Sequence, residues 1–252
     1  MALGSLYIVV PCCNEEEALP RAVSVLLEKL RALAGAALVA PESRLLLVDD
    51  GSADGTWAII EALFRTNIEV CGLRLDGNRG HQNAVMAGLV TAAERADAAI
   101  SIDADLQDDP DAIDAMVKKW NAGAPVVCGV RRSRKSDAVF KRVSARGFYL
   151  LARLGGAKVL YDHADFRLLS REAVGRLTRF GTEDLFLRGL VTRLGLPVET
   201  VYYDRRPRLE GESKYTMRKM LHLAMRGFSS GRMKAADSPQ IGNLHIERTL
   251  LQ

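Results

Sequence analysis

Three clusters of oxygen-bearing side chains in this chain could bind a ligand or a cation, and each follows a short apolar run. They are residues 11–16 (PCCNEE), 49–56 (DDGSADGT) and 103–110 (DADLQDDP). Any one of them alone could be a turn whose Asp or Asn caps the next helix. Because all three follow predicted strands, we expect them to meet at one edge of a sheet and to form a ligand site.

The third cluster is the most informative about chemistry. Asp103 and Asp105 are two residues apart just after a buried run, so an extended backbone would turn both carboxylates to one side. Hard divalent cations such as Mg²⁺ and Mn²⁺ prefer oxygen ligands, and Gln107 could add a carbonyl oxygen. Such a cation would neutralise the charge that builds up on a departing diphosphate. The alternative, a loop that caps the following helix, fits Asp108 and Asp109 better than it fits Asp103.

Strand and helix patterns alternate through the first half of the chain. Short apolar runs predict strands, and the longer amphipathic stretches between them predict helices. The predicted strands are 5–10, 44–48, 68–75, 98–102 and 125–130, and the predicted helices are 15–33, 54–64, 79–95 and 110–120. This alternation predicts an α/β fold with a mostly parallel sheet, whose functional loops lie at the carboxyl ends of the strands.

The second half of the chain is less regular. Its predicted elements are helices at 139–154, 183–194 and 215–228, strands at 166–169 and 198–203, and a basic loop at 205–214. We therefore expect a catalytic domain over residues 1–214 and an amphipathic helix over residues 215–228. We expect a poorly ordered tail over residues 229–252, where the pattern dissolves into Ser, Gly, Pro and scattered polar residues.

Charge is distributed unevenly along the chain, which has 252 residues and a net charge of +4. Residues 1–130 contain 10 Lys and Arg against 19 Asp and Glu, a net charge of −9. Residues 131–234 contain 24 Lys and Arg against 10 Asp and Glu, a net charge of +14. An acidic half can hold a divalent cation, and a basic half can hold phosphates or an anionic surface. Two solvated faces of opposite sign would give the same counts.

Several function classes are disfavoured by what the sequence lacks. It contains no G-x-x-x-x-G-K-[ST] loop and no G-x-G-x-x-G after the first predicted strand, which argues against kinases, NTPases and dinucleotide-dependent dehydrogenases. The four cysteines have no paired spacing, so we expect neither a disulfide framework nor a zinc site. The N-terminus does not read as a signal peptide, and no apolar run approaches the ~18 residues of a membrane span. We therefore expect a cytoplasmic protein.

Four motifs occur in a fixed order along the chain. They are P-x-x-N-E-E from Pro11, D-D-G-S-x-D-G-T from Asp49, D-x-D-L-Q-x-x-P from Asp103 and R-x-x-G-x-S-K-Y from Arg208. Together, over about residues 5–228, they resemble the inverting family 2 glycosyltransferases of the GT-A fold, and most closely the polyprenyl-phosphate hexosyltransferases. That group includes dolichyl-phosphate mannose synthase and undecaprenyl-phosphate glucosyltransferases. The resemblance implies a Rossmann-like, mostly parallel sheet flanked by helices, with Mg²⁺ or Mn²⁺ as cofactor.

The resemblance also implies roles for individual residues by their positions in these motifs. The expected nucleotide-binding residues are Pro11, Glu15, Asp50 and Asp103, and the expected metal ligands are Asp103, Asp105 and Gln107. The expected catalytic residues are Asp105, Asp165, Arg131 and Arg134, and the expected acceptor-phosphate ligands are Arg208, Ser213 and Lys214. Asp165 would orient the acceptor or stabilise a developing oxocarbenium ion. Its alternative role is a structural salt bridge to Arg167 or to another arginine.

The implied activity is the transfer of a hexose from a nucleotide sugar, with a UDP-sugar favoured, to a polyprenyl phosphate. A phosphate monoester is already a nucleophile at neutral pH because its second pKa is about 6, so it needs cationic partners more than a general base. Two alternatives remain open. One is a transferase that acts on a hydroxyl acceptor and requires a general base, and the other is a subunit that binds nucleotide sugar without turnover.

The sequence departs from the family pattern at two places. Cys13 stands where an aromatic ring that stacks on the nucleobase is expected, and such stacking is worth about 1–3 kcal/mol. The two membrane spans that commonly follow in bacterial relatives are not seen, although residues 215–228 form a basic amphipathic pattern that suits an anionic membrane surface or a protein core. We expect peripheral binding at the cytoplasmic face of the membrane. The expected partners include a homo-oligomer or a membrane partner subunit, and no nucleic acid.

Overall fold

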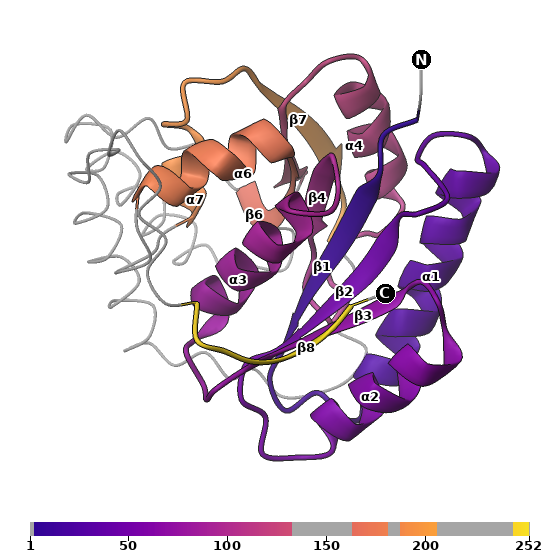
Figure 1. Cartoon of the computed structure of the whole chain (residues 1–252). Coiled ribbons are helices and arrows are strands. Elements are labelled where there is room, and N and C mark those ends of the chain that lie inside the picture. The colour runs from indigo at the N-terminus through magenta and orange to yellow at the C-terminus, as the bar shows by residue number, and fades with distance from the viewer. Residues whose placement is uncertain (1–2, 133–162, 181–186, 206–243, 252) are drawn as a thin grey trace, which may run out of the picture.

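An eight-stranded mixed sheet forms the centre of the part of the chain that the computed structural model describes, which is residues 3–132, 163–180, 187–205 and 244–251 (Figure 1). Its strands are β1 (Leu6–Cys12), β2 (Arg44–Asp49), β3 (Val70–Leu75), β4 (Ala98–Ser101), β5 (Val126–Arg131), β6 (His163–Ser170), β7 (Val198–Tyr203) and β8 (Ile246–Leu250). Their order across the sheet is β7-β5-β6-β4-β1-β2-β3-β8. Strand β1 pairs in parallel with β2 and β4, and β2 pairs in parallel with β3, as the alternation of strands and helices predicts.

Strand β6 separates the two parallel parts of the sheet. It lies between β4 and β5 and is antiparallel to both, while β7 is parallel to β5. Because β6 is antiparallel, its first residues lie beside the last residues of β4, and Arg167 pairs with Ser101. The insertion of this strand therefore brings Asp165 to the carboxyl edge of the sheet, next to the loop that begins at Asp103.

Helices cover both faces of the sheet (Figure 1). The helices α1 (Leu19–Gly35), α2 (Thr56–Thr66) and α4 (Ala112–Asn121) pack on one face. The helices α3 (His81–Ala93), α6 (Arg171–Leu177) and α7 (Leu187–Val191) pack on the other face, together with the 3₁₀ turn Thr178–Phe180. This arrangement leaves the carboxyl ends of β1, β2 and β4 for loops.

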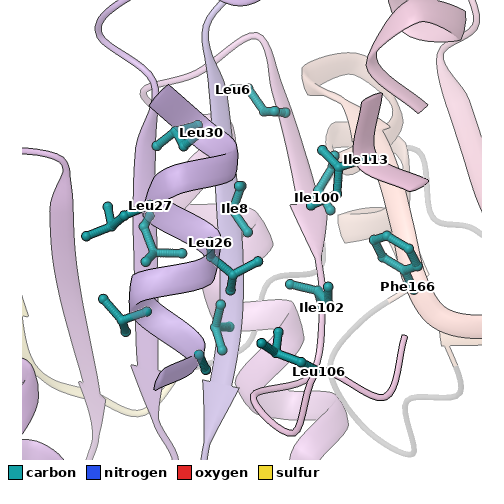
Figure 2. Close-up of a cluster of buried hydrophobic side chains, with 14 of the residues drawn as sticks. Leu6, Ile8, Leu26, Leu27, Leu30, Ile100, Ile102, Leu106, Ile113 and Phe166 are labelled. Carbon is teal, nitrogen blue, oxygen red and sulfur yellow. The ribbon is translucent and has the colours of Figure 1, made fainter. Parts of the chain in front are cut away.

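The packing of helices on the sheet fixes the positions of those loops. Figure 2 shows Leu26 and Leu30 of α1 packed over Ile8 of β1, and these side chains are almost fully buried. Burying a leucine contributes about 1.5–3 kcal/mol, so this face resists distortion. On the other face Gly88 lets α3 approach β1, since a Cβ at this position would lie 2.4 Å from a methyl group of Val9. The start of α3 is thereby held at the carboxyl edge.

The observed elements agree with the predicted ones through the first half, except at their ends. Helix α1 begins at Leu19 and not at residue 15, and the N–H groups of Glu15 and Glu16 before it bond to side chains of the next loop. Helix α6 was not predicted, because its seven residues are too few to show a helical period. Ser170 caps it by accepting a hydrogen bond from the N–H of Ala173.

Part of the segment that was predicted to be a poorly ordered tail, residues 229–252, is an ordered strand. Residues 246–250 form β8, which pairs antiparallel with β3 at the edge of the sheet. Leu250 of β8 packs beside Gly72, where a Cβ would lie 2.7 Å from Cγ2 of Ile60 in α2 and 3.2 Å from Cδ1 of Leu250. A short strand with mostly exposed side chains has little apolar alternation, so the sequence does not reveal it.

Several predicted elements lie outside the described residues. They are the helices at 139–154 and 215–228, the basic loop from residue 206 onward, and the first residues of the helix at 183–194, of which the structure describes α7. None of the helices in the described ranges combines the length and the apolar character that a membrane crossing would need.

Candidate active site

The loops that follow β1 and β2 are joined by hydrogen bonds. The N–H of Asn14 donates to Oγ of Ser52 (2.9 Å), and Oδ1 of Asn14 accepts from the N–H of Ala53 (2.8 Å). The N–H of Glu15 donates to Oγ1 of Thr56 (2.9 Å). Asn14 has a φ of 54°, a left-handed conformation that asparagine tolerates better than most residues. The backbone that carries Glu15, a predicted nucleotide ligand, is therefore held in one position.

The loop that follows β3 is held by Asp50. The two carboxylate oxygens of Asp50 accept hydrogen bonds from the N–H groups of Arg79 (2.6 Å) and Gly80 (2.9 Å). Burial raises the pKa of Asp50, although these two N–H groups oppose the shift. Gly51 is required beside it, because its φ is 64° and a Cβ would lie 2.3 Å from the carbonyl carbon of Gly77. The predicted contact of Asp50 with a nucleobase stays a prediction.

The loops after β1, β2 and β3 therefore form one unit. We call it the loop cluster, and it comprises residues 13–18, 50–55 and 76–80. Cys13, which stands where an aromatic ring was expected, is half-buried and accepts a hydrogen bond at Sγ from the side-chain amide of Asn78 (3.1 Å). The thiol thus joins the loops after β1 and β3. Pro11, another predicted nucleotide-binding residue, is buried in β1, where it pairs with Val48.

The acidic loop after β4 presents two partly exposed carboxylates. The side chain of Asp103 is 40% exposed. Oδ1 of Asp105 accepts a hydrogen bond from the N–H of Gln107 (3.1 Å), and Oε1 of Gln107 accepts one from the guanidinium of Arg205. Leu106, between them, has a φ of 48°, which is rare for a leucine and marks a strained turn. Desolvation raises the pKa of Asp103, and the nearby carboxylates of the same edge raise it further.

His81, the first residue of α3, lies between the carboxylates of Asp103 and Asp165. Its Nε2 atom is 3.6 Å from Oδ1 of Asp103 and 3.7 Å from Oδ2 of Asp165. These distances exceed ordinary hydrogen bonds and fit an electrostatic contact. His81 was not among the predicted site residues, and its one signal in the sequence is the glycine-rich turn before it, residues 77–80. His81 joins the third loop of the loop cluster to the acidic loop.

Asp165 is held between two arginines. Its Oδ1 atom accepts from Arg167 (2.5 Å) and from Nε of Arg188 (3.2 Å), and its Oδ2 atom accepts from Arg188 (2.9 Å). Burial opposes ionisation, but the guanidinium groups of Arg188 and Arg167 hold the pKa of Asp165 well below its ordinary value. The salt bridge that was the structural alternative for Asp165 is thus present, and it lies at the candidate site. Arg188 was missed, because no local pattern pairs it with a residue 23 positions away.

A second ion pair lies at the ends of β5 and β7. Oδ1 of the buried Asp108 accepts from both Nε (3.1 Å) and a terminal nitrogen (2.8 Å) of Arg131 and from the hydroxyl of Tyr203 (2.6 Å). Burial and the adjacent carboxylate raise the pKa of Tyr203. Arg131 was predicted to face a lipid phosphate, and in this structure its guanidinium binds Asp108. We call Asp108, Arg131, Asp165, Arg167 and Arg188 the ion-pair cluster.

The remaining predicted site residues lie outside the described ranges. They are Arg134, Arg208, Ser213 and Lys214. Among the predicted residues that are described, the fold brings Glu15, Asp50, Asp103, Asp105, Gln107, Arg131 and Asp165 to the carboxyl edge of the sheet. Strand β4 lies between β1 and β6, so its acidic loop lies between the loop cluster and Asp165.

The donor atoms of the acidic loop fit a hard divalent cation. Two carboxylates and an amide oxygen on one short loop suit Mg²⁺ or Mn²⁺ better than a soft metal. Across the described ranges, no group of three or more His, Cys, Asp or Glu side chains is arranged to hold a metal ion. Mg²⁺ typically keeps several waters and binds substrate phosphates, so such a cation at Asp103 and Asp105 would take further ligands from water or from a phosphate.

Comparisons with solved structures confirm the predicted α/β fold of the GT-A type. The structure superimposes on glucosyl-3-phosphoglycerate synthase from Mycobacterium tuberculosis with a TM-score of 0.62 and 19% identity, over 92% of this chain and 82% of that one. It superimposes on mannosyl-3-phosphoglycerate synthase from Rubrobacter xylanophilus with a TM-score of 0.62 and 15% identity, over 99% of this chain and 87% of that one.

Comparisons of sequence identify the family. The chain is 47% identical to the uncharacterized glycosyltransferase YkoT of Bacillus subtilis, over 89% of this chain and 67% of that protein. It is 36% identical to the bactoprenol glucosyl transferase of Shigella phage SfV, over 89% of this chain and 71% of that protein. Residues 7–178 match the profile of glycosyl transferase family 2. The chain therefore belongs to glycosyl transferase family 2.

Proposed function

We propose that this chain transfers a hexose from a nucleotide sugar to a polyprenyl phosphate, with inversion at the anomeric carbon. The observation that carries the proposal is the pair of partly exposed carboxylates, Asp103 and Asp105, between the loop cluster and the ion-pair cluster. Relatives named bactoprenol glucosyl transferases, 36% identical over 89% of this chain, support a polyprenyl phosphate as the acceptor.

The loop cluster is the proposed site of the nucleotide. The residues that contact the nucleotide would be Glu15 and Asp50 of the loop cluster, with Pro11 and Asp103 outside it, as the family resemblance implies. A UDP-sugar is favoured, because the relatives are named as glucosyl transferases and the M. tuberculosis enzyme of the same fold was solved with Mn²⁺ and UDP-glucose. Cys13 would lie near the base, and its contact with Asn78 would shape that part of the site.

The proposed cation ligands are Asp103, Asp105 and Gln107. A bound Mg²⁺ or Mn²⁺ would supply positive charge to the departing nucleoside diphosphate. The protein contributes a preformed loop, since Oδ1 of Asp105 already accepts the N–H of Gln107 (3.1 Å). Arg205 would add positive charge beside the diphosphate through its contact with Gln107.

The state of Asp165 supports an acceptor that needs no general base. Its carboxylate is ionised and bound by Arg167 and Arg188, and such a group is a poor proton acceptor. An acceptor phosphate oxygen would form a bond to the anomeric carbon while the bond from that carbon to the diphosphate oxygen breaks. No proton has to move in this step. Asp165 would lie near the sugar and stabilise positive charge that develops there.

Cationic residues of the second half would bind the acceptor phosphate. The resemblance implies Arg134, Arg208, Ser213 and Lys214 for this role. Arg131 would contribute indirectly, since its guanidinium binds Asp108 and leaves the side chain 22% exposed. The predicted amphipathic helix at 215–228 would bring the chain to the cytoplasmic face of the membrane as a peripheral protein, alone, as a homo-oligomer or with a membrane partner subunit.

Two measurements test the proposal. Calorimetry with UDP-glucose and GDP-mannose in the presence of Mn²⁺ should give binding of one nucleotide class, and radiolabelled sugar should then move to a short polyprenyl phosphate. Transfer to a hydroxyl acceptor, with a pH dependence set by one carboxylate, would support the second candidate activity. Binding of nucleotide sugar with no transfer to either acceptor would identify the chain as a binding subunit.

Membrane binding has its own test. The triple variant Met220→Asp/Leu221→Asp/Met225→Asp should lose binding to vesicles that contain anionic lipid, because these residues form the apolar side of the predicted helix. Unchanged vesicle binding by this variant would contradict a peripheral role for residues 215–228.

A further inference from the structure

We infer that the C-terminal strand β8 positions the loop cluster for nucleotide binding, with His245 and Glu247 as positioning residues. The strand enters the sheet at the carboxyl end of β3, since it is antiparallel to β3 and Ile246 pairs with Leu75. This is the edge at which β2 ends at Asp49 and is followed by Asp50. The proposal rests on the proposed function, because it takes these loops to bind the nucleotide.

The start of β8 has two backbone irregularities that direct its side chains toward this edge. His245 has a φ of 57°, in the left-handed region that residues other than glycine rarely adopt. The register between Leu75–Arg74 and Ile246–Arg248 then shifts by one residue, so Glu247 is an extra residue in β8. A bulge of this kind changes the direction in which a side chain points, and bulges are frequent at sheet edges and next to active sites.

The bulged residue contacts Asp49 through an arginine. The carboxylate of Glu247 lies 3.6 Å from Nε of Arg74, and the same Nε lies 3.3 Å from Oδ2 of Asp49. Asp49 is fully buried, and its other oxygen accepts the N–H of Ser52 (3.1 Å). The guanidinium of Arg74 also lies over the ring of Trp57, 5.6 Å from its centroid. Glu247 thus helps to hold the cation that neutralises a buried carboxylate beneath the loop after β2.

A second series of contacts leads from β8 to Asp50. The carbonyl oxygen of His245 accepts the N–H of Asp76 (2.7 Å), and its Nδ1 atom lies 3.3 Å from Oδ2 of Asp76. Oδ1 of Asp76 accepts Nε of Arg79 (2.8 Å), and the N–H of Arg79 donates to Asp50 (2.6 Å). Strand β8 therefore contacts both members of the Asp49–Asp50 pair through separate intermediates.

A substitution at an apolar residue of β8 can detach the strand without replacing any residue of these contacts. Leu250 is partly buried against the core and lies over Gly72, whereas its neighbour Thr249 is exposed. Leu250→Asp should release the strand, because it would place a carboxylate against the apolar core on which Leu250 packs. Thr249→Asp adds the same charge to the exposed side of the same strand and is the matched control.

Hydrogen exchange and nucleotide binding test the proposal in the full chain. In Leu250→Asp the amides of Arg79 and Gly80, which donate to Asp50, should exchange faster than in Thr249→Asp and in the wild type. The dissociation constant for UDP should rise by about threefold to thirtyfold, the range expected for coupling between neighbouring elements. The turnover rate at saturating nucleotide sugar should change less than the dissociation constant, because Asp103 and Asp105 are not displaced.

A second variant keeps the test valid if Leu250→Asp does not fold. Glu247 is 48% exposed, so Glu247→Lys should fold normally while it repels Arg74 and weakens UDP binding. Unchanged protection of the Arg79 and Gly80 amides together with unchanged UDP affinity in the folded variants would overturn the proposal. If the wild type binds neither UDP nor GDP, the proposed function fails, and the exchange of the two amides still decides whether β8 holds the loop.

Discussion

The loop cluster lies on one side of the acidic loop, and the ion-pair cluster lies on the other side and includes Asp108 of that loop. The two clusters are stabilised in different ways. In the loop cluster, backbone N–H groups donate to neutral or carboxylate side chains of the neighbouring loop, as in the contacts of Asn14 and Asp50. In the ion-pair cluster, side-chain charges neutralise each other where water is excluded, as for Arg167, which is 0% exposed. Backbone donors of this kind fix the course of the loop backbone, whereas paired charges preset the electrostatic field of the site.

The largest expected effect lies in the acidic loop between the two clusters. Asp105→Asn should lower the turnover rate about 10²–10³-fold, because it removes one anionic ligand of a cation that is worth several kcal/mol in the transition state. Steady-state kinetics with Mn²⁺ measure this loss, and urea unfolding should be unchanged since Asp105 is partly exposed.

Asp109→Asn is the matched control for Asp105→Asn. Asp109 lies on the same loop, and its Oδ1 atom accepts the N–H of Asp111 (3.0 Å), which an asparagine can also do. The control should keep wild-type turnover. Metal-dependent turnover that survives in Asp105→Asn would remove the acidic loop from the proposed mechanism.

The next largest effect should break the ion-pair cluster. Asp165→Asn leaves the buried guanidinium of Arg167 without its carboxylate and should lower the free energy of unfolding by about 3 kcal/mol. Thermal unfolding should then occur about 6–12 °C lower for a chain of this size. Asp204→Asn, at an exposed position after β7, is the control and should unfold like the wild type.

The loss in Asp165→Asn should depend on pH in a defined direction. The pKa of Asp165 is held well below its ordinary value in the folded chain, so its ionised form stabilises the fold above the unfolded-state pKa of about 3.9. That contribution is lost as the pH falls below this value toward the folded-state pKa. Urea titrations with a chelator present at pH 7 and pH 3 should therefore differ less between variant and wild type at the lower pH. An equal difference in unfolding free energy between variant and wild type at pH 7 and at pH 3 would contradict the ion pair of Asp165 with the two arginines.

The two clusters also differ in how far the sequence predicts them. The loop cluster follows from local features: each strand end is marked by Pro, Asn, Asp or Gly, and parallel crossovers place consecutive strand ends together. The predicted residues Glu15, Asp50, Asp103 and Asp105 accordingly lie at one edge. The role of Asp50 in holding the third loop could not be predicted, because its partners are backbone amides 29 and 30 residues away.

The ion-pair cluster depends on strand pairing that no local pattern reveals. Strand β6 enters antiparallel between β4 and β5, and only this order brings Asp165 near His81 and Asp103. A sequence of alternating strands and helices predicts parallel neighbours and so gives no reason to place β6 there. Arg188 was missed for the same reason, because its partner Asp165 lies on β6. The guanidinium of Arg131 binds Asp108 in this structure, and its role at a lipid phosphate stays a prediction.

His81 connects the two clusters, and its removal should have an intermediate effect. His81→Ala should lower the turnover rate about tenfold and raise the Mn²⁺ concentration needed for half-maximal activity, as for other residues that support metal ligands. The reason is that Nε2 separates the carboxylates of Asp103 and Asp165, which would otherwise repel each other. His81→Gln, which retains a donor at this position, should recover most of the activity. Equal activity of the alanine variant and the wild type would separate the two clusters functionally.

The smallest expected effect concerns the hydroxyl of Tyr203. Tyr203→Phe removes the 2.6 Å hydrogen bond to Asp108 while the bonds from Arg131 remain, so the free energy of unfolding should fall by about 1–2 kcal/mol. Thermal unfolding measures this, and Tyr202→Phe, at the preceding residue, which is 56% exposed, is the control. Identical unfolding of the two variants would mean that Arg131 alone satisfies Asp108. A loss confined to Tyr203→Phe, with turnover retained, would show that this end of the ion-pair cluster stabilises the site without contacting the substrate.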